Sequence, residues 1–336
     1  MNQNTGNSLK NEYDNIFSKN NIIKSLFRHE TIILLAIILL FAGVSLKVPT
    51  FRSLENIIAI LKYTSFLGIL TIPITFLLIS SRFDLSIGMS TLLIGNIMGI
   101  MLRDLNISIP LMLFVGLVVS ILIGLINGFL TTTAKINALI ATIGTMFMFK
   151  GLSWVITGNY SISGITKKIA GLSEVVFNIP VGLFVLAFLL IIGIVVLSTS
   201  KLGRSVYAIG KDEDVSRLAG IPVSVYRYSL YIFSAFCCYI VAVLTIVNFK
   251  SFPAQTGIDW EFLVHAGCIL GGCSIYGGKG TIPGGILGVS FMITLESSLR
   301  ALKVSSYYQI VLVGIILIFA VFTDTLRYKR LQKLKT

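Results

Sequence analysis

Residues 107–130 read ISIPLMLFVGLVVSILIGLINGFL, a run without a charged side chain. A helix of about 20 apolar residues crosses the hydrocarbon core of a bilayer, so the run predicts a transmembrane helix from Ile107 to Leu130. Its proline, Pro110, falls in the first turn, where a missing N–H breaks no helical hydrogen bond. The stretch therefore indicates a membrane protein, and similar runs recur along the chain.

The composition supports this interpretation. Hydrophobic residues make up 55% of the 336 residues and charged residues only 12%, against about 25% charged in soluble domains. The 30 glycines suit helices that pack closely in lipid. We expect an all-α polytopic membrane fold of about ten transmembrane helices. The predicted spans are Thr31–Leu46, Ile57–Ser80 with Pro73 inside it, Leu85–Leu102, Ile107–Leu130, Ile136–Gly158, Ile179–Ser198, Tyr226–Asn248, Phe262–Ile275, Pro283–Leu299 and Tyr307–Phe322.

Lysine and arginine in the loops predict the orientation. With ten spans, roughly twice as many basic residues lie on the side of the N-terminus as on the other side, which places both termini in the cytoplasm. The chain then divides into a cytoplasmic tail (1–30), a transmembrane domain (31–326) and a basic cytoplasmic tail (327–336). A long cytoplasmic loop (199–225) separates spans six and seven. The net charge of +13 follows from this pattern, so we expect a lipid bilayer and no nucleic acid as partner.

The chain lacks the residues of an energy-converting enzyme. The nearest approach to a nucleotide-binding P-loop is CSIYGGKG (273–280), which lacks the first glycine and has Gly280 where Ser or Thr must hold magnesium. Two histidines are too few for a credible catalytic triad, and the four cysteines show no metal-ligand spacing. We expect no enzyme activity, no cofactor and no metal site in this chain, so work must come from another subunit.

Two polar segments interrupt the apolar pattern near the spans. FDLSIG (83–88) contains Asp84 and Ser86, which either cap the third span or mark the mouth of a pathway. Farther on, Asn127 precedes INALIATIGT (136–145), in which Thr142 and Thr145 recur with other small residues. Close helix packing explains these small residues, and a face that lines the solute pathway is the alternative.

The loop Gly203–Pro222 is the long cytoplasmic segment between spans. Its residues from Asp212 to Ala219 predict a short amphipathic helix, bracketed by the breakers Gly210 and Gly220. The apolar side of that helix needs a partner surface unless the segment is an ordinary solvated loop. A second glycine-rich segment, Gly271–Gly285, predicts a tight turn between closely packed helices, with Lys279 at the inner interface.

Four segments in order resemble the sugar-type permeases of bacterial ABC importers, a group that includes ribose, xylose, galactose and autoinducer-2 permeases. The resemblance runs from about Ile57 to Arg330. Members carry a DLSVG-type segment, NG followed by an IATLGT-type segment, a long inner loop and a GG-x-S-x-x-GG-[RK]-G segment. These stand here at 84–88, 127–128 with 140–145, 203–221 and 271–280, and SSYYQ (305–309) matches the start of the last span. Departures occur at Arg82-Phe83, Asn137-Ala138, Asp212 and Val215-Ser216.

The resemblance implies a mechanism and partners. An extracytoplasmic sugar-binding protein delivers the solute, two permease chains form the pathway in the bacterial inner membrane, and two ATPase subunits that hold ATP and magnesium drive it. In this chain the ATPase would grip the inner-loop helix, and the implied coupling residues are Gly203, Arg204, Gly210, Glu213, Arg217 and Gly220. The pathway candidates are Asp84, Ser86, Asn127, Thr142 and Thr145.

Three alternatives stay open, and one of them is a purely structural or receptor membrane protein. A branched-chain amino-acid ABC permease has a similar inner loop, although the DLS segment and the spacing favour a sugar. An ion-coupled secondary transporter needs ionisable groups inside the spans. Lys62, Lys150 and Glu296 are the candidates that the sequence offers for that role.

Overall fold

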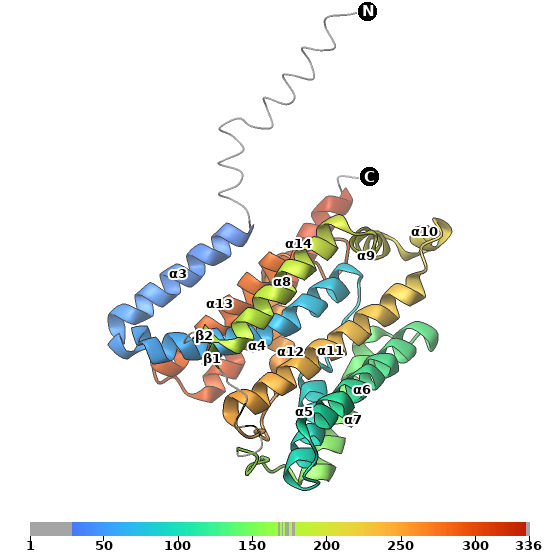
Figure 1. The fold of residues 1–336 in the computed structure, drawn as a ribbon. Helices are drawn as coiled ribbons and strands as arrows, with labels where there is room; N and C mark the ends of the chain where they lie inside the picture. Colours follow the sequence, from blue (N-terminus) through green and yellow to red (C-terminus); the bar gives the residue numbers. More distant parts are fainter. Residues whose placement is uncertain (1–28, 167–168, 170, 172–174, 177–178, 334–336) are drawn as a thin grey trace, which may run out of the picture.

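The structure, a computed structural model, describes residues 29–166, 169, 171, 175–176 and 179–333. The predicted N-terminal tail, residues 1–28 in particular, lies outside these residues. The described chain is a bundle of helices with one short antiparallel hairpin, β1 (Val175–Val176) and β2 (Ile179–Pro180). The predicted all-α membrane fold is confirmed (Figure 1).

Within the described residues, eight helices are long and apolar enough to cross a membrane, and two further apolar helices are shorter. Together they correspond to the ten predicted spans. The long helices are α3 (His29–Lys47), α4 (Leu54–Ile79), α6 (Ile109–Gly128), α7 (Ala138–Thr157), α8 (Val181–Thr199), α11 (Val223–Phe249), α13 (Ile282–Ala301) and α14 (Ser306–Lys333), and the short ones are α5 (Ile87–Arg103) and α12 (Trp260–Leu270). A 3-10 turn (Pro49–Arg52) precedes α4, and a π-helical turn (Phe129–Thr133) extends α6.

Span eight differs most from its prediction. The sequence predicts a helix from Phe262 to Ile275, but α12 ends at Leu270 because Gly272 adopts a φ of +97°. Glycine reaches this backbone region without a steric penalty, and a chain that takes it leaves the helix. The last helix, α14, instead continues to Lys333, well past the predicted end of its span at Phe322.

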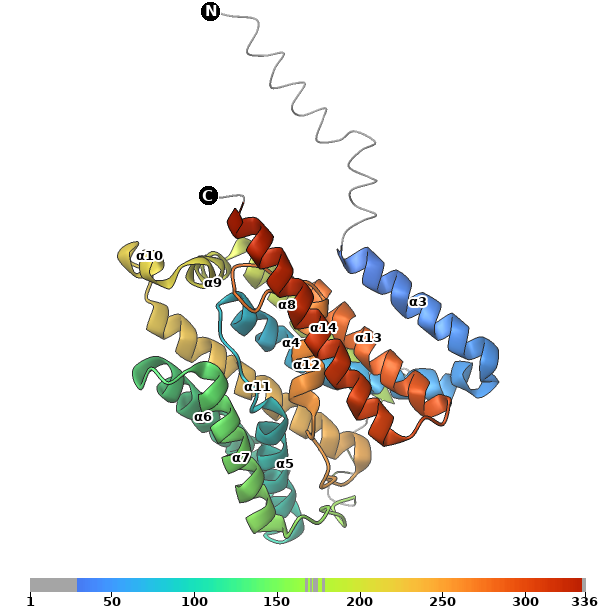
Figure 2. The same cartoon turned by 180° about the vertical axis from the view of Figure 1, so that it is seen from behind.

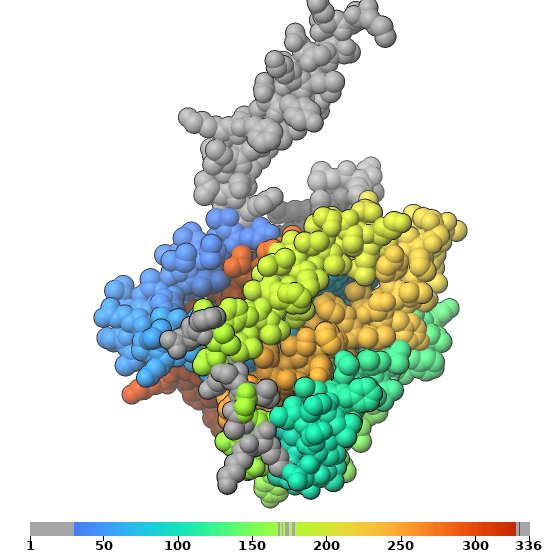
Figure 3. Space-filling model, viewed as in Figure 1, coloured from blue at the N-terminus to red at the C-terminus, as the bar shows by residue number. Residues whose placement is uncertain are grey.

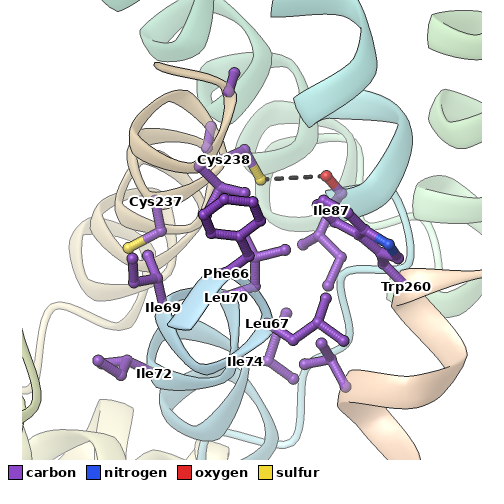
Figure 4. Close-up of a cluster of buried hydrophobic side chains, with 14 of the residues drawn as sticks. Phe66, Leu67, Ile69, Leu70, Ile72, Ile74, Ile87, Cys237, Cys238 and Trp260 are labelled. Carbon is purple, nitrogen blue, oxygen red and sulfur yellow. Dashed lines mark hydrogen bonds between the residues drawn. The ribbon is translucent and has the colours of Figure 1, made fainter. Parts of the chain in front are cut away.

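Helix α4 forms the centre of the core. Every residue from Ser65 to Ile79 is buried, including Pro73 inside the helix. Figure 4 shows how Phe66, Leu67 and Leu70 of α4 lie among Ile87, Trp260 and the buried cysteines of α11. The outer helices expose apolar side chains instead, such as Phe188 and Ile191 on α8, and Figure 3 shows α8 at the surface of the molecule. This distribution suits lipid on the outside of the bundle.

One end of the bundle gathers several segments that are far apart in the sequence. The start of α3, the end of α14 and the segment 200–222 lie at this end in both views (Figures 1 and 2). Contacts agree with the pictures, because Thr281 donates to Glu30 at 3.0 Å and Ser274 donates to Asp324 at 3.0 Å. We call it the α9–α10 end, after the two helices of that segment, α9 (Lys201–Lys211) and α10 (Glu213–Leu218).

Candidate functional site

Asp84 lies at the centre of a buried polar network. Its side chain is only 3% exposed, and it accepts hydrogen bonds from the Ser86 hydroxyl at 2.7 Å and the Ser86 N–H at 3.0 Å. The hydroxyl of Ser234, from α11, donates to the other carboxylate oxygen at 2.7 Å. Burying a carboxylate is costly unless donors surround it, and here three donors do. The structure therefore shows Asp84 joining the start of α5 to α11.

The network continues into α6 and α7 through Asn127. The Asn127 amide donates to the Ser86 hydroxyl at 2.8 Å, and its carbonyl oxygen accepts from the Thr145 hydroxyl at 2.8 Å. Thr142, one turn earlier on α7, donates to Ala138 of its own helix. The sequence-predicted pathway residues thus come together, and Thr142 joins them only through its main-chain carbonyl, which lies 3.2 Å from the Thr145 hydroxyl. All five are buried, so in this conformation their bonds tie helices together.

The segment 200–222 differs from its prediction in one respect. The sequence predicts one helix bracketed by Gly210 and Gly220, but the structure has two helices that meet at Asp212. Gly210 lies inside α9, so its assignment as a helix breaker is wrong. Asp212 makes the break, because its extended backbone ends α9 and its side chain accepts from the N–H of Val215 at 3.0 Å, capping α10. Gly220 follows α10 with a φ of +78°.

Gly210 serves a tight packing contact. A Cβ atom there would lie 1.7 Å from the carbonyl oxygen of Ile79 and 2.7 Å from the nitrogen of Gly278. No side chain fits at such distances, so α9 meets the end of α4 and the turn after α12 through main-chain atoms. The N–H of Gly278 donates to the Ile79 carbonyl at 2.8 Å. We call this three-way contact of Gly210, Ile79 and Gly278 the main-chain junction.

The turn between α12 and α13, residues 271–281, is bonded to its neighbours at several points. As the sequence predicts, it is a tight turn, with positive φ at Gly272, Gly277, Gly278 and Gly280. Tyr207 of α9 donates to the Gly280 carbonyl at 2.7 Å. Asp324 of α14 accepts from both the hydroxyl of Ser274 and the N–H of Ile275. A direct hydrogen bond therefore joins α9 to the turn that connects α12 with α13.

Glu213, at the start of α10, is surrounded by three arginines. Arg217 donates to it at 2.7 Å, Arg227 of α11 donates to both carboxylate oxygens, and Arg82 lies 3.5 Å away. Burial alone would raise the pKa of Glu213, but hydrogen bonds from Arg227 and Arg217 and the charge of Arg82 lower it to about 2. The cluster attaches α10 to α11 and to the loop between α4 and α5. Glu213 is thus an internal anchor of α10.

The outer side of α10 presents apolar side chains that the described part of the chain leaves exposed. Leu218 is 89% exposed and Val215 is 60% exposed. Arg204 lies on α9 and donates to the Thr199 carbonyl at 2.9 Å. Gly203, one residue earlier, packs against the backbone of Leu197, because a Cβ atom there would lie 2.2 Å from its carbonyl oxygen. An exposed leucine on a short helix that is rigidly held is suited to contact another protein.

Two ionisable residues inside the bundle escaped the sequence analysis. Glu261 and His265 lie one turn apart on α12, are almost fully buried, and each has one side-chain atom without a hydrogen-bond partner within the described structure. His265 Nδ1 contacts the Glu261 carbonyl at 2.7 Å, and its ring stacks on Phe83. The spacing Glu-x-x-x-His within an apolar run was the available signal. Of the three candidates predicted for ion coupling, Glu296 pairs with Arg300 at 2.7 Å and Lys150 lies over the Trp154 ring.

A cavity of about 800 Å³ opens at the end of the bundle opposite α9 and α10. Residues of α4, α11, α12 and α13 line it together with the loop before α12. The lining residues used below are Lys62, Tyr63, Asn248, Gln255, Trp260 and Arg300. A neighbouring cavity of about 390 Å³ shares Tyr63 and Arg300 with it.

These features define an integral membrane protein whose helices surround a buried polar network, with the helix pair α9 and α10 at one end and a cavity at the other. Residues 56–321 match the family model described as "branched-chain amino acid transport system / permease component". The chain belongs to this family of transport permeases.

Individual relatives match along most of their length. The chain is 30% identical over 295 residues to the ribose import permease protein of Haemophilus influenzae, covering 86% of this chain and 91% of the relative. It is 30% identical to the L-arabinose transport system permease protein of Escherichia coli, covering 88% and 89%. It is 28% identical to the autoinducer 2 import system permease protein of Salmonella typhi, covering 88% and 85%. No solved structure matches the chain.

Proposed function

We propose that this chain is the membrane-spanning permease subunit of an ATP-binding cassette importer for a sugar or sugar-like solute. The observation that carries the proposal is the match along nearly the whole chain to import permeases named for ribose and L-arabinose. The family description names branched-chain amino acids, so a panel of solutes must include leucine. In this proposal the chain itself does not hydrolyse ATP, and ATP and magnesium bind to a separate ATPase subunit.

The proposed orientation places the α9–α10 end in the cytoplasm of a bacterium, with both termini on that side of the inner membrane. ATPase subunits dock there, an extracytoplasmic binding protein delivers the solute to the opposite end, and a second permease chain completes the pathway. The unequal distribution of basic residues in the loops supports this orientation. A reporter that is active only outside the cytoplasm should be on when fused after Lys168 and off when fused after Arg330, and the reverse pattern contradicts it.

The contacts of α9 and α10 suit the transmission of force. A push on α10 reaches α11 through the Arg227–Glu213 ion pair and reaches α4 through the main-chain junction. Because Gly278 of the same junction belongs to the turn between α12 and α13, the push reaches that turn as well. A helix held at several points moves its neighbours, whereas a loosely attached loop would not. The proposed coupling residues Gly203, Arg204, Gly210, Glu213, Arg217 and Gly220 then divide into those that shape and anchor the segment and those that face the partner.

The exposed face of α10 gives the sharper test, because Arg217 also belongs to the internal cluster around Glu213. Leu218→Asp changes a side chain that is 89% exposed, so the fold should persist. We expect loss of co-purification with the ATPase subunit and loss of sugar-stimulated ATP hydrolysis in the reconstituted complex, because a carboxylate cannot be buried in an apolar contact without cost.

Leu105→Asp is the matched control. Leu105 is also a strongly exposed leucine, at 63%, but it lies in the loop between α5 and α6, away from α10. We expect this variant to keep both ATPase binding and stimulated hydrolysis. If Leu218→Asp behaves like Leu105→Asp, α10 is not the docking site. Uptake that continues without ATP would instead favour an ion-coupled carrier.

A further inference from the structure

The cavity opposite α10 combines apolar and polar walls. Its apolar wall contains Tyr63 and Trp260, whose rings meet edge to face with centroids 6.2 Å apart. Trp260 is only 7% exposed, so its position is fixed by packing against the core. A rigid aromatic wall is suited to the C–H face of a sugar ring, since this face is apolar although the rim of the ring carries hydroxyls.

The polar wall supplies donors and acceptors in the same cavity. Asn248 comes from the end of α11 and Gln255 from the loop that follows, and each amide offers two donors and one acceptor oxygen. Lys62 of α4 and Arg300 of α13 add further donors, with Arg300 also bonded to Glu296. Hydroxyl groups both donate and accept, so this mixture matches a polyhydroxylated ligand. It suits the branched aliphatic side chain of leucine less well, because polar groups around it would lose hydration without compensation.

The cavity is also connected to the rest of the bundle through α12. Trp260 is the first residue of α12, and the turn after the last residue of this helix meets α9 at the main-chain junction. The helix starts after Gly257 and Asp259, both in the left-handed backbone region, with φ of +84° and +63°. A ligand against Trp260 therefore touches one end of a short helix whose other end contacts the proposed coupling segment.

We infer that this cavity is a binding site for a polyhydroxylated solute of sugar size, held against Trp260 and Tyr63 and hydrogen-bonded by Asn248 and Gln255. The inference rests on the proposed function for the class of solute. It adds a position and a set of contacts within a single permease chain. At about 800 Å³ the cavity is within the usual range of ligand pockets.

The two tryptophans of the chain allow a direct binding test. Trp154 lies on α7 beneath Lys150 and is absent from the cavity lining. In the Trp154→Phe variant, the remaining tryptophan is Trp260, so its fluorescence reports on the cavity. We titrate the purified full chain with D-ribose, L-arabinose, D-xylose and D-galactose, and with L-leucine as the solute that the inferred site should not bind. We expect a saturable change in emission with at least one sugar.

The matched control is Trp260→Phe, which keeps Trp154 as the single reporter and should show no saturable change. Gln255→Leu in the Trp154→Phe background tests the polar wall. Gln255 is exposed in a loop, so the variant should fold, and loss of its hydrogen bonds should weaken binding at least about fivefold. No saturable change with any of the sugars, or an equal change with Trp260→Phe, overturns the inference. The test involves neither ATP nor the ATPase, so its failure is distinct from failure of the docking experiment on Leu218.

Discussion

Replacing Asp84 by alanine removes the acceptor at the centre of the polar network. The carboxylate accepts from the Ser86 hydroxyl, the Ser86 N–H and the Ser234 hydroxyl. Hydrogen bonds to a charged group contribute about 1.5–3 kcal/mol each, and an unpaired buried donor costs about 1–3 kcal/mol. Because a serine hydroxyl can turn to a carbonyl of its own helix, part of this loss is recovered. We expect the free energy of unfolding to fall by about 3 kcal/mol.

The assay is the apparent melting temperature of the purified protein in one detergent at a fixed scan rate. At about 2 °C per kcal/mol for a chain of this size, Asp84→Ala should melt about 6 °C lower. Asp104→Ala is the control, because Asp104 pairs with Arg103 at an exposed site, where ion pairs contribute about 0–1 kcal/mol. Adding Ser234→Ala to Asp84→Ala should cost little more, because the donor has already lost its acceptor. Equal melting of the Asp84 and Asp104 variants would refute the reasoning.

Three further predictions concern other parts of the chain. Gly210→Val should lower the melting temperature by several degrees and uncouple ATP hydrolysis from uptake, because its side chain would overlap the Ile79 carbonyl; normal coupling in the reconstituted complex would contradict this. The pKa of Glu213 is lowered to about 2, so its ion pairs stabilise the fold fully above about pH 4.5 and lose that effect as the pH falls towards 2. The melting temperature of the native chain should accordingly fall more steeply over this window than that of Glu213→Gln, and parallel curves would count against it. Glu296→Gln should retain substantial uptake, because the pair with Arg300 is partly exposed; abolished uptake that recovers when the external pH is shifted would point to an ion-coupled carrier.

The fold was largely predictable because lipid imposes a simple rule on sequence. A helix in a bilayer must form all its backbone hydrogen bonds within itself and present apolar side chains to lipid. Each crossing therefore appears in the sequence as an apolar run of nearly fixed length, such as residues 107–130. The rule weakens where a helix is enclosed by protein. Helix α12 is short and ends at Leu270, whereas the sequence pattern includes the glycine-rich residues after it in a longer span.

The site was predictable in part, and the limit has a physical cause. Asp84, Ser86, Asn127 and Thr145 stand out as polar residues in apolar surroundings, but their bonds join segments up to 150 residues apart. No local pattern gives such pairings. Asp212 ends α9 through its extended backbone and caps α10 through its side chain, whereas the sequence pattern favours Gly210 as the breaker.

The cavity wall depends on four helices and a loop that meet only after folding. For Glu261 the sequence offers only its spacing to His265 within an apolar run, and this spacing does not say that the carboxylate is buried. Both features depend on contacts between segments that are far apart in the sequence. Local sequence patterns indicate secondary structure but not which segments come into contact.

The main-chain junction also determines which residues at the α9–α10 end can change during evolution. Since Gly210, Ile79 and Gly278 meet there through backbone atoms, the joint constrains glycines, namely Gly210 and the positive-φ Gly277 and Gly278, more than the identity of any larger side chain. The outward residues of α10, Val215 and Leu218, take no part in that joint. Under the proposed docking role, mutations on this outward surface would change which ATPase subunit binds while the contacts behind it stay intact. Recognition of the partner and transmission of its movement would then be separable traits, open to independent selection.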